Sequence, residues 1–260
     1  MDKPTLDRLF DVRDRVAIVT GGTRGIGRAI AEGFVCGGAK VVVGSRKADA
    51  CLETEAHLRE LGAGTGGDAV AISAHMGELD AATALVDRAV DVFGGVDIVV
   101  NNAANALTQP LGSFTPEAWQ KSFDVNLRGP VFLVQAALSQ LERSDHASVV
   151  NVISAGAFLF AANVAMYSAA KAAMMSFTRS MAADFAPRGI RVNALAPGTV
   201  DTDMVRANTP EVQQSMANAS YMRRAASPDE MVGPVLYLAS DASSFMTGQV
   251  LLVDGGLVPH

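Results

Sequence analysis

Seven short apolar segments recur along the chain, and segments with helical periodicity separate most of them. They are Val16–Thr20, Lys40–Gly44, Asp68–Ala74, Val96–Asn101, Ser148–Ser154, Ile190–Ala196 and Val250–Val253. Short segments that are apolar on both faces are typical of parallel strands covered by helices on both sides. Between the first two, Ile26, Ile30 and Phe34 repeat at the spacing of one helix face. The pattern predicts an α/β protein with a doubly wound parallel sheet of about seven strands.

The length of 260 residues fits one large domain, and no low-complexity linker divides the chain. We therefore expect a single domain over residues 1–260. The stretch from Thr199 to about Ser227 mixes polar and Met residues without a clear period. We expect an irregular loop there, which is a candidate substrate lid at about 199–227 because ligands bind beyond the carboxyl ends of such strands. A surface insertion is the alternative.

Charge and composition exclude several classes of partner. A net charge of −6 without a cluster of Lys and Arg argues against nucleic acid and against an anionic membrane surface. The two cysteines exclude a disulfide framework, and the four histidines lack metal-ligand spacing, so we expect no metal. Residues 1–15 contain no apolar targeting core, and the uncharged stretch Ala147–Ala170 holds polar residues that are costly in a bilayer. A cytoplasmic protein is the expectation.

A glycine-rich turn, Thr20-Gly21-Gly22-Thr23-Arg24-Gly25-Ile26-Gly27, follows the first predicted strand directly. Glycine at the first position permits a tight turn, and the later glycines let the backbone approach a pyrophosphate. A helix that begins here directs free N–H groups and the positive end of its dipole toward the phosphates. No Gly-Lys-Ser/Thr follows, which excludes a P-loop. The turn predicts a dinucleotide site, with an ordinary strand–helix turn as the alternative.

The end of the second predicted strand bears on the choice of dinucleotide. In this type of sheet an acidic residue there binds the ribose 2′-hydroxyl of NAD. Here the strand ends Gly44-Ser45-Arg46-Lys47, without an acid. Arg46, joined by Arg24 from the glycine turn, could bind a 2′-phosphate through charge-assisted hydrogen bonds. The sequence therefore favours NADP(H) over NAD(H), with two solvated arginines as the alternative.

Tyr167 and Lys171 are four residues apart, so on a helix they share a face. An ammonium group near a phenol lowers the phenol pKa from about 10, which makes tyrosine usable as a general acid or base. Ser154 stands at the end of a predicted strand, where its hydroxyl can enter the same crevice. It lacks the Gly-x-Ser-x-Gly context of a hydrolase nucleophile.

Together these motifs resemble the short-chain dehydrogenase/reductase family, whose fold is a Rossmann-type sheet, over about Val16 to Gly256. The resemblance is carried by the glycine turn, Tyr-x-x-x-Lys, Asn101-Asn102-Ala103-Ala104 (Asn-Asn-Ala-Gly in the family), Asp124-Val125-Asn126-Leu127, Pro197-Gly198-Thr199-Val200-Asp201-Thr202 and Val253-Asp254-Gly255-Gly256. His75-Met76 departs from the Asp-Val that the family more often has beside the adenine, which leaves the contact to adenine open.

The resemblance implies four catalytic residues: Asn126, Ser154, Tyr167 and Lys171. It also implies the cofactor-binding residues Gly21, Thr23, Arg24, Gly25, Ile26, Gly27, Ser45, Arg46, Met76, Asn102, Ala103, Ala104, Ile153, Tyr167, Lys171, Pro197, Gly198, Val200 and Thr202. In the implied reaction Tyr167 exchanges a proton with the substrate oxygen, which Ser154 hydrogen-bonds. Lys171 would lower the Tyr167 pKa and hold the nicotinamide ribose, and Asn126 would position a water.

The implied activity is NADP(H)-dependent hydride transfer between nicotinamide and a carbonyl or secondary alcohol. We expect a small, mostly neutral and hydrophobic substrate, because the predicted pocket walls carry positive charge only at three loop arginines. These walls are Asn105–Thr108, Ala155–Met166 and residues 199–225, with Arg206, Arg223 and Arg224 in the loop. The family also implies a homo-oligomer, a tetramer or a dimer.

Three other activities are alternatives. A 3-oxoacyl-thioester reductase resembles the chain globally, but Met181-Ala182-Ala183-Asp184 lacks the arginine that such enzymes usually carry for carrier docking. A cofactor-sensing protein without turnover typically lacks the tyrosine or the lysine. Enoyl reductases have a longer Tyr–Lys spacing. A carbonyl reductase or alcohol dehydrogenase is the favoured hypothesis.

Overall fold

The seven apolar segments form one parallel sheet in the computed structural model, which describes residues 2–159 and 163–258. The strands are β1 (Val16–Thr20), β2 (Lys40–Ser45), β3 (Asp68–Ser73), β4 (Ile98–Asn101), β5 (Ser148–Val152), β6 (Arg191–Pro197) and β7 (Val250–Val253). Their order is β3-β2-β1-β4-β5-β6-β7, and every neighbouring pair is parallel. The predicted doubly wound sheet is confirmed, with strand ends that differ from the prediction by at most two residues.

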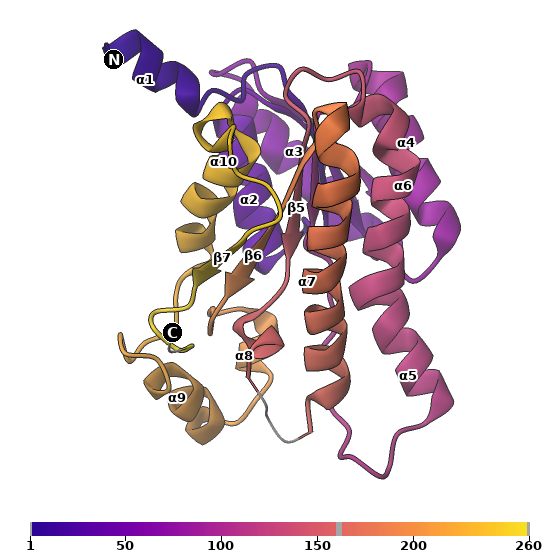
Figure 1. Ribbon diagram of the computed structural model, residues 1–260, viewed down its shortest axis with the longest axis vertical. Helices are drawn as coiled ribbons and strands as arrows, with labels where there is room; N and C mark the ends of the chain where they lie inside the picture. Colours follow the sequence, from indigo (N-terminus) through magenta and orange to yellow (C-terminus); the bar gives the residue numbers. More distant parts are fainter. Residues whose placement is uncertain (1, 160–162, 259–260) are drawn as a thin grey trace.

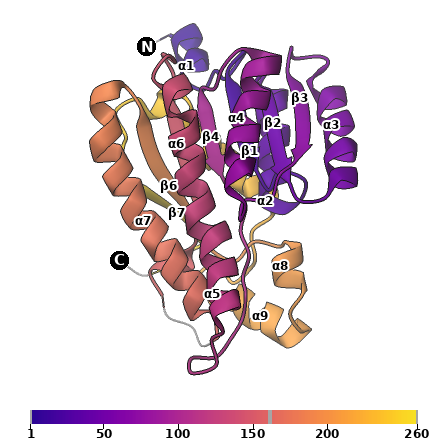
Figure 2. The ribbon, with the colours of Figure 1, turned by 90° about the vertical axis from the view of Figure 1, so that its right-hand side faces the viewer.

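Helices cover both faces of this sheet, as Figures 1 and 2 show. The described α-helices are α1 (Lys3–Leu9), α2 (Gly25–Cys36), α3 (Ala48–Gly62), α4 (Leu79–Phe93), α5 (Pro116–Phe123), α6 (Gly129–Leu141), α7 (Ala165–Phe185), α8 (Asp203–Arg206), α9 (Pro210–Asn218) and α10 (Val232–Ala239). Leu85 of α4 and Leu133 of α6 pack on one face of the sheet, together with α7. Phe34 of α2 and Leu58 of α3 pack on the other, together with α10.

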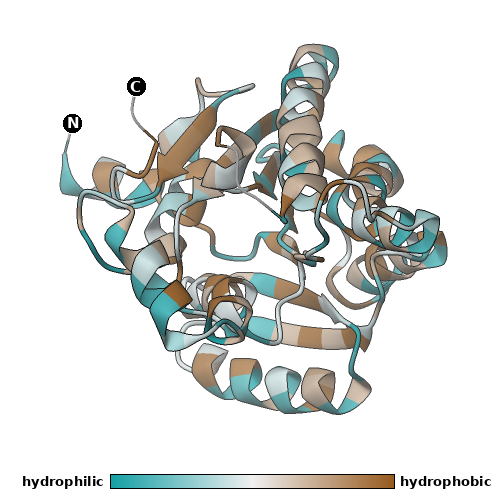
Figure 3. Ribbon diagram, turned by 90° about the horizontal axis from the view of Figure 1, so that it is seen from below, coloured by the Kyte–Doolittle hydropathy of each residue, from teal (hydrophilic) through white to brown (hydrophobic). Residues whose placement is uncertain are grey.

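The core is built from the alternation of strand side chains between the two faces. Ile18 belongs to the cluster under α4 and α6, whereas its neighbour Val19 belongs to the cluster under α2 and α10. Both are fully buried, and each such side chain contributes about 1.5–3 kcal/mol of hydrophobic stabilisation. The helices carry both hydrophobic and hydrophilic residues, as Figure 3 shows, which is expected of helices with one buried face.

A short π-helical turn, Asp124–Arg128, joins α5 to α6. Pro130 has no N–H to donate to the Asn126 carbonyl one helical turn earlier, so the regular helical bond cannot form there. Instead the N–H of Gly129 donates to the Asp124 carbonyl, the longer bond of a π-turn. The sequence therefore places a local widening of the helix at Asn126.

The segment 199–227 is not the irregular loop that we expected. It contains α8 and α9, which lie below the arrowheads of the strands in Figure 1. Thr209 caps α9 by accepting from the Val212 N–H, and Pro210 occupies the first helical position. At the base of the segment, Val200 and Ala226 form a β-bridge. A lid function for this segment remains a proposal.

Two features are absent from the described residues, 2–159 and 163–258. None of their helices has the length and apolarity needed to cross a bilayer. They also bring together no group of three or more His, Cys, Asp or Glu side chains suited to a metal ion.

Candidate active site

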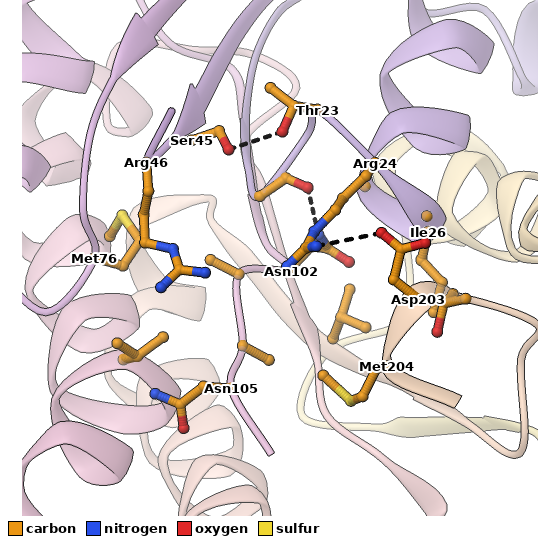
Figure 4. Close-up of a pocket in the computed structure, with 18 of the residues that line it drawn as sticks. Thr23, Arg24, Ile26, Ser45, Arg46, Met76, Asn102, Asn105, Asp203 and Met204 are labelled. Atoms are coloured by element: carbon orange, nitrogen blue, oxygen red, sulfur yellow. Dashed lines mark hydrogen bonds and ion pairs between the residues drawn. The ribbon is translucent and has the colours of Figure 1, made fainter. Parts of the chain in front are cut away.

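A cavity of about 600 Å³ opens where the strands end. Every cofactor-binding residue predicted from the sequence lines it, from the glycine turn through Ser45 and Met76 to Thr202. The turns that follow β1, β2, β4, β5 and β6 all contribute, which is the usual ligand position in a doubly wound sheet. Figure 4 shows one part of this wall. The structure thus brings the predicted cofactor set together, and its binding role remains a prediction.

The glycine turn has a backbone that larger residues could not adopt without clashes. Gly21 and Gly25 have φ values of +67° and +52°, in the left-handed region. A Cβ on Gly27 would lie 2.3 Å from Asn102 Nδ2 and 2.4 Å from the Gly21 carbonyl oxygen. Asn102 Nδ2 also donates to the Thr20 carbonyl at 2.9 Å, which fixes the turn against the end of β4. The bare backbone beside the start of α2 fits a pyrophosphate.

Hydroxyl groups and arginines surround the end of β2. The strand itself contributes no carboxylate there. Thr23 Oγ1 and Ser45 Oγ are 2.8 Å apart, which connects the glycine turn to β2. The Arg46 side chain extends along the cavity in Figure 4. Arg24 lines the same cavity, but its Nη1 lies 3.2 Å from Asp203 Oδ2 of α8. These donors fit a ribose 2′-phosphate.

His75 and Met76, from the loop after β3, also line the cavity. His75 Nδ1 accepts a hydrogen bond from the Gly77 N–H at 3.1 Å. Arg128 of the π-turn donates to the Gly77 carbonyl at 2.8 Å. A Cβ on Gly129 would lie 2.0 Å from the Met76 carbonyl oxygen. The π-turn therefore packs directly against the loop that departs from the family pattern.

Three of the four predicted catalytic residues meet on the cavity wall: Ser154, Tyr167 and Lys171. Ser154 follows β5 in an extended conformation, and its hydroxyl oxygen accepts from the Gly156 N–H at 3.0 Å. Lys171 Nζ donates to the Val152 carbonyl at 2.8 Å, which anchors α7 to the end of β5. The same Nζ lies 5.7 Å from the centre of the Tyr167 ring.

Burial is the largest influence on the pKa values of Tyr167 and Lys171. It lowers the pKa of Lys171 from 10.5 to about 8. Burial also raises the pKa of Tyr167, and a hydrogen bond with Ser154 opposes it in part. The expectation that Lys171 lowers the Tyr167 pKa is therefore not met in this structure, because the loss of hydration outweighs other effects. At neutral pH the phenol is protonated, the form that can donate a proton.

Asn126 lies behind the cavity wall rather than on it. Its Nδ2 donates to the carbonyls of Asn105 and Ser122, each at 2.9 Å, and its Oδ1 accepts from the Asn105 N–H at 3.1 Å. The side chain is 1% exposed. Its amide thus holds Asn105, which does line the cavity, and its backbone carbonyl belongs to the π-turn.

Known proteins resemble the chain over almost all of its length. A family model described as "Enoyl-(Acyl carrier protein) reductase" matches residues 21–258. A crystal structure of a short-chain type dehydrogenase/reductase from Mycobacterium marinum is 31% identical, with a TM-score of 0.90, over 98% of this chain and 99% of that chain. The chain belongs to the short-chain dehydrogenase/reductase family. As a member of this family, the protein is an oxidoreductase.

Two further relatives differ in the activity that their names give. The 3-oxoacyl (acyl-carrier-protein) reductase from Agrobacterium tumefaciens C58, solved with NADP bound, is 36% identical with a TM-score of 0.88, over 96% of this chain and 97% of that chain. A protein named "Probable galactose dehydrogenase GalD" from Rhizobium meliloti (strain 1021) is 38% identical over 95% of this chain and 96% of its own length. The family is shared, whereas the substrates differ.

Within this family site, some wall residues were not predicted from the sequence. Ala50 of α3 and Lys121 of α5 line the cavity, and no motif marked them. Of the predicted substrate walls, Asn105, Val200 and residues 202–205 line it. Residues 160–162 of the predicted wall Ala155–Met166 lie outside the described residues. The missed positions face the cavity through the packing of α3 and α5, which local sequence does not report.

Proposed function

We propose that this protein is an NADP(H)-dependent oxidoreductase that transfers a hydride between nicotinamide and the carbonyl or secondary alcohol of a small, mostly neutral substrate. The observation that carries the proposal is that Ser154, Tyr167 and Lys171 line the same cavity as the glycine turn. A proton donor therefore stands in the same cavity as the backbone cradle for a dinucleotide. NADP(H), when bound, supplies or accepts the hydride.

Tyr167 and Ser154 act on the substrate oxygen. In carbonyl reduction the Tyr167 hydroxyl gives its proton to the oxygen as negative charge develops there. The Ser154 hydroxyl donates a hydrogen bond to the same oxygen and stabilises that charge. The raised pKa of Tyr167 keeps the phenol protonated at neutral pH, which favours this direction. In the reverse direction the deprotonated Tyr167 oxygen accepts the proton of a secondary alcohol, while Ser154 hydrogen-bonds the alcohol oxygen.

Lys171 and Asn126 support Tyr167 and Ser154 without contacting the substrate oxygen. Lys171, held by the Val152 carbonyl, would donate to the nicotinamide ribose and supply positive charge next to the phenol. Asn126 holds Asn105, and the carbonyl that Pro130 leaves without its helical donor can bind a water. Such a water would pass protons to Lys171 from solvent.

The charges of the loop support a mostly neutral substrate. Arg206 forms a two-point ion pair with Asp201 at 2.7 and 2.9 Å. Arg224 forms another with Glu230, with both contacts at 2.7 Å. Two of the three loop arginines are thus already paired within the protein. Substrate carboxylates have less to gain from this loop than the sequence alone indicates.

A 3-oxoacyl thioester is the second candidate substrate, because the NADP-bound relative carries that name. A matched screen tests both: NADPH oxidation with simple ketones, ketoses and an acetoacetyl thioester, and NADP⁺ reduction with alcohols and aldoses. Turnover of a neutral ketone, sugar or alcohol above the thioester supports the proposal. A clear preference for the thioester would favour the second candidate, and no turnover with any of them would favour a cofactor-sensing protein.

We also propose a cytoplasmic homo-oligomer, a tetramer or a dimer, as the family resemblance implies. Phe245 is fully exposed and Phe177 of α7 is 41% exposed, which leaves large apolar groups for a neighbouring subunit to cover. Sedimentation velocity measures the assembly directly, and a monomer at micromolar concentration would contradict it.

Cofactor preference should invert in the double variant Ser45→Asp with Arg46→Ala. We expect the wild type to favour NADPH over NADH by at least about tenfold in kcat/KM, since one charge-assisted contact contributes about 1.5–3 kcal/mol before solvent and salt weaken it. In the variant a carboxylate repels the 2′-phosphate and accepts from the 2′-hydroxyl of NADH. Steady-state kinetics with each cofactor decide the matter. A wild-type ratio of kcat/KM for NADPH to that for NADH near one would contradict the predicted preference.

The lowered pKa of Lys171 predicts pH-dependent cofactor binding. The charged form dominates below its pKa of about 8 and is lost as the pH rises through that value. Because NADPH is an anion, its Kd should rise between about pH 7 and pH 9, by at most roughly tenfold. The same titration with Lys171→Ala should show weaker binding and a flatter profile. An unchanged wild-type Kd over this range would contradict the charge assignment.

A further inference from the structure

Helix α8 touches the glycine turn at two neighbouring points. Arg24 Nη1 lies 3.2 Å from Asp203 Oδ2, and a Cβ on Gly25 would lie 3.1 Å from Thr202 Cγ2. Figure 4 shows the two charged side chains meeting, with Arg24 from the turn and Asp203 from the start of α8. The candidate lid is therefore fastened to the part of the cavity that would receive the cofactor.

Within the described residues, Arg24 is the residue with which Asp203 forms an ion pair. The neighbouring acid, Asp201, is already bound at two points by Arg206. The base of the segment is held separately by backbone bonds, in which the Asp201 N–H donates to the Ala226 carbonyl and the Ala226 N–H to the Thr199 carbonyl, both at 2.9 Å. The Arg24–Asp203 pair can therefore open without releasing the base.

The pair occupies the guanidinium that the proposed function assigns to the 2′-phosphate. Arg24 and Arg46 both line the cavity, and the hydroxyl pair Thr23–Ser45 links the segments that carry them. A phosphate dianion bound to Arg24 would lie beside the Asp203 carboxylate, and the two negatively charged groups would repel each other. Either the carboxylate leaves Arg24 or the phosphate binds more weakly.

We propose that Asp203 is a specificity-determining residue: its carboxylate competes with the 2′-phosphate for Arg24, so that NADP(H), and not NAD(H), exchanges one ion pair for another and releases α8 from the glycine turn. The inference rests on the proposed function and adds a competitor that the cofactor motif does not contain. NADH carries a neutral hydroxyl at this place and has no reason to displace Asp203.

The size of the effect follows from the exposure of the pair. The Arg24 and Asp203 side chains are 66% and 61% exposed, and exposed pairs are weak. Asp203→Asn should therefore strengthen NADPH binding by about two- to fivefold and leave NADH binding within error. The gain should shrink as salt is added, because salt screens exposed charges.

The direct test is a set of Kd values for NADPH and NADH, measured by nicotinamide fluorescence on the full chain. Asp229→Asn is the matched control, because it makes the same charge change in the small cavity that Asp203 also lines. This control should leave both Kd values unchanged. If NADPH affinity rose equally in both variants, or if Asp203→Asn raised the affinities for NADPH and NADH equally, the change in net charge would explain the effect. Either result would overturn the proposal.

A double-variant cycle isolates the contact itself. In an Arg24→Ala background, Asp203→Asn should no longer change NADPH affinity, since the competed group is gone. Hydrogen exchange of residues 203–207 supplies a second readout, with faster exchange expected after NADPH than after NADH. Retention of the full gain without Arg24, or identical exchange with both cofactors, overturns the proposal. If neither cofactor binds the wild type, the proposed function fails; if both bind and the cycle shows no coupling, this inference alone fails.

Discussion

Tyr167→Phe should lower kcat by roughly 10²–10⁴ and leave the Kd for NADPH nearly unchanged. The substitution removes only the phenol oxygen that carries the reacting proton. The ring remains, so the buried position and the cation–π contact with Lys171 are retained. Single-turnover rates with the best substrate of the screen, together with fluorescence titration of NADPH, separate chemistry from binding.

Tyr237→Phe is the matched control for this experiment. It deletes the same atom from a half-buried tyrosine of α10 that packs against the core on the face opposite α7. Its turnover should remain close to that of the wild type. If Tyr167→Phe kept a third of the wild-type kcat, the proton-transfer assignment would be wrong, whatever the effect on binding.

Gly27→Ala should weaken NADPH binding strongly. The added methyl would lie 2.3 Å from Asn102 Nδ2 and 2.4 Å from the Gly21 carbonyl oxygen, so the turn or the end of β4 has to move. Alanine is the better helix former, and Gly27 lies within α2, so a loss cannot come from helix propensity. We expect NADPH affinity to fall by more than about tenfold, because a shift of this cradle misplaces the phosphate contacts.

Gly64→Ala supplies the control, because a Cβ there meets nothing within 4 Å. It adds the same methyl group to the connection after α3 and should leave binding unchanged. Thermal unfolding of both variants shows whether any loss reflects global destabilisation. A folded Gly27→Ala protein that binds NADPH as the wild type does would rule out the assignment of this turn to the phosphates.

Much of the fold could be predicted because it depends on local pattern. Val16–Thr20 and Val250–Val253 match β1 and β7 because apolar strands end where polar turns begin. The helices α8 and α9 were missed because their few apolar residues form no clear period. Yet Thr209, followed by Pro210, is a helix-start signal that could have been recognised.

The features of the site also divide into those that local sequence predicts and those that depend on the fold. The motifs identified most of the residues that line the cavity, since several motifs sit at strand ends and Tyr-x-x-x-Lys lies on α7, which packs beside them. Burial of Tyr167 and the pairing of Arg24 with Asp203 depend on distant segments that meet only in the fold. For that reason the direction of the Tyr167 pKa shift and the competitor at the phosphate site could not be predicted from spacing.

Isotope transfer tests the central claim most directly. NADPH labelled with deuterium on both positions of nicotinamide C4 is incubated with the protein and the best carbonyl substrate, and the alcohol is examined by mass spectrometry and NMR. The proposed hydride transfer predicts one deuterium at the carbinol carbon of each product molecule, with the hydroxyl proton derived from solvent through Tyr167. Product without deuterium at that carbon, or no NADPH oxidation with any carbonyl or alcohol of the screen, would contradict the account.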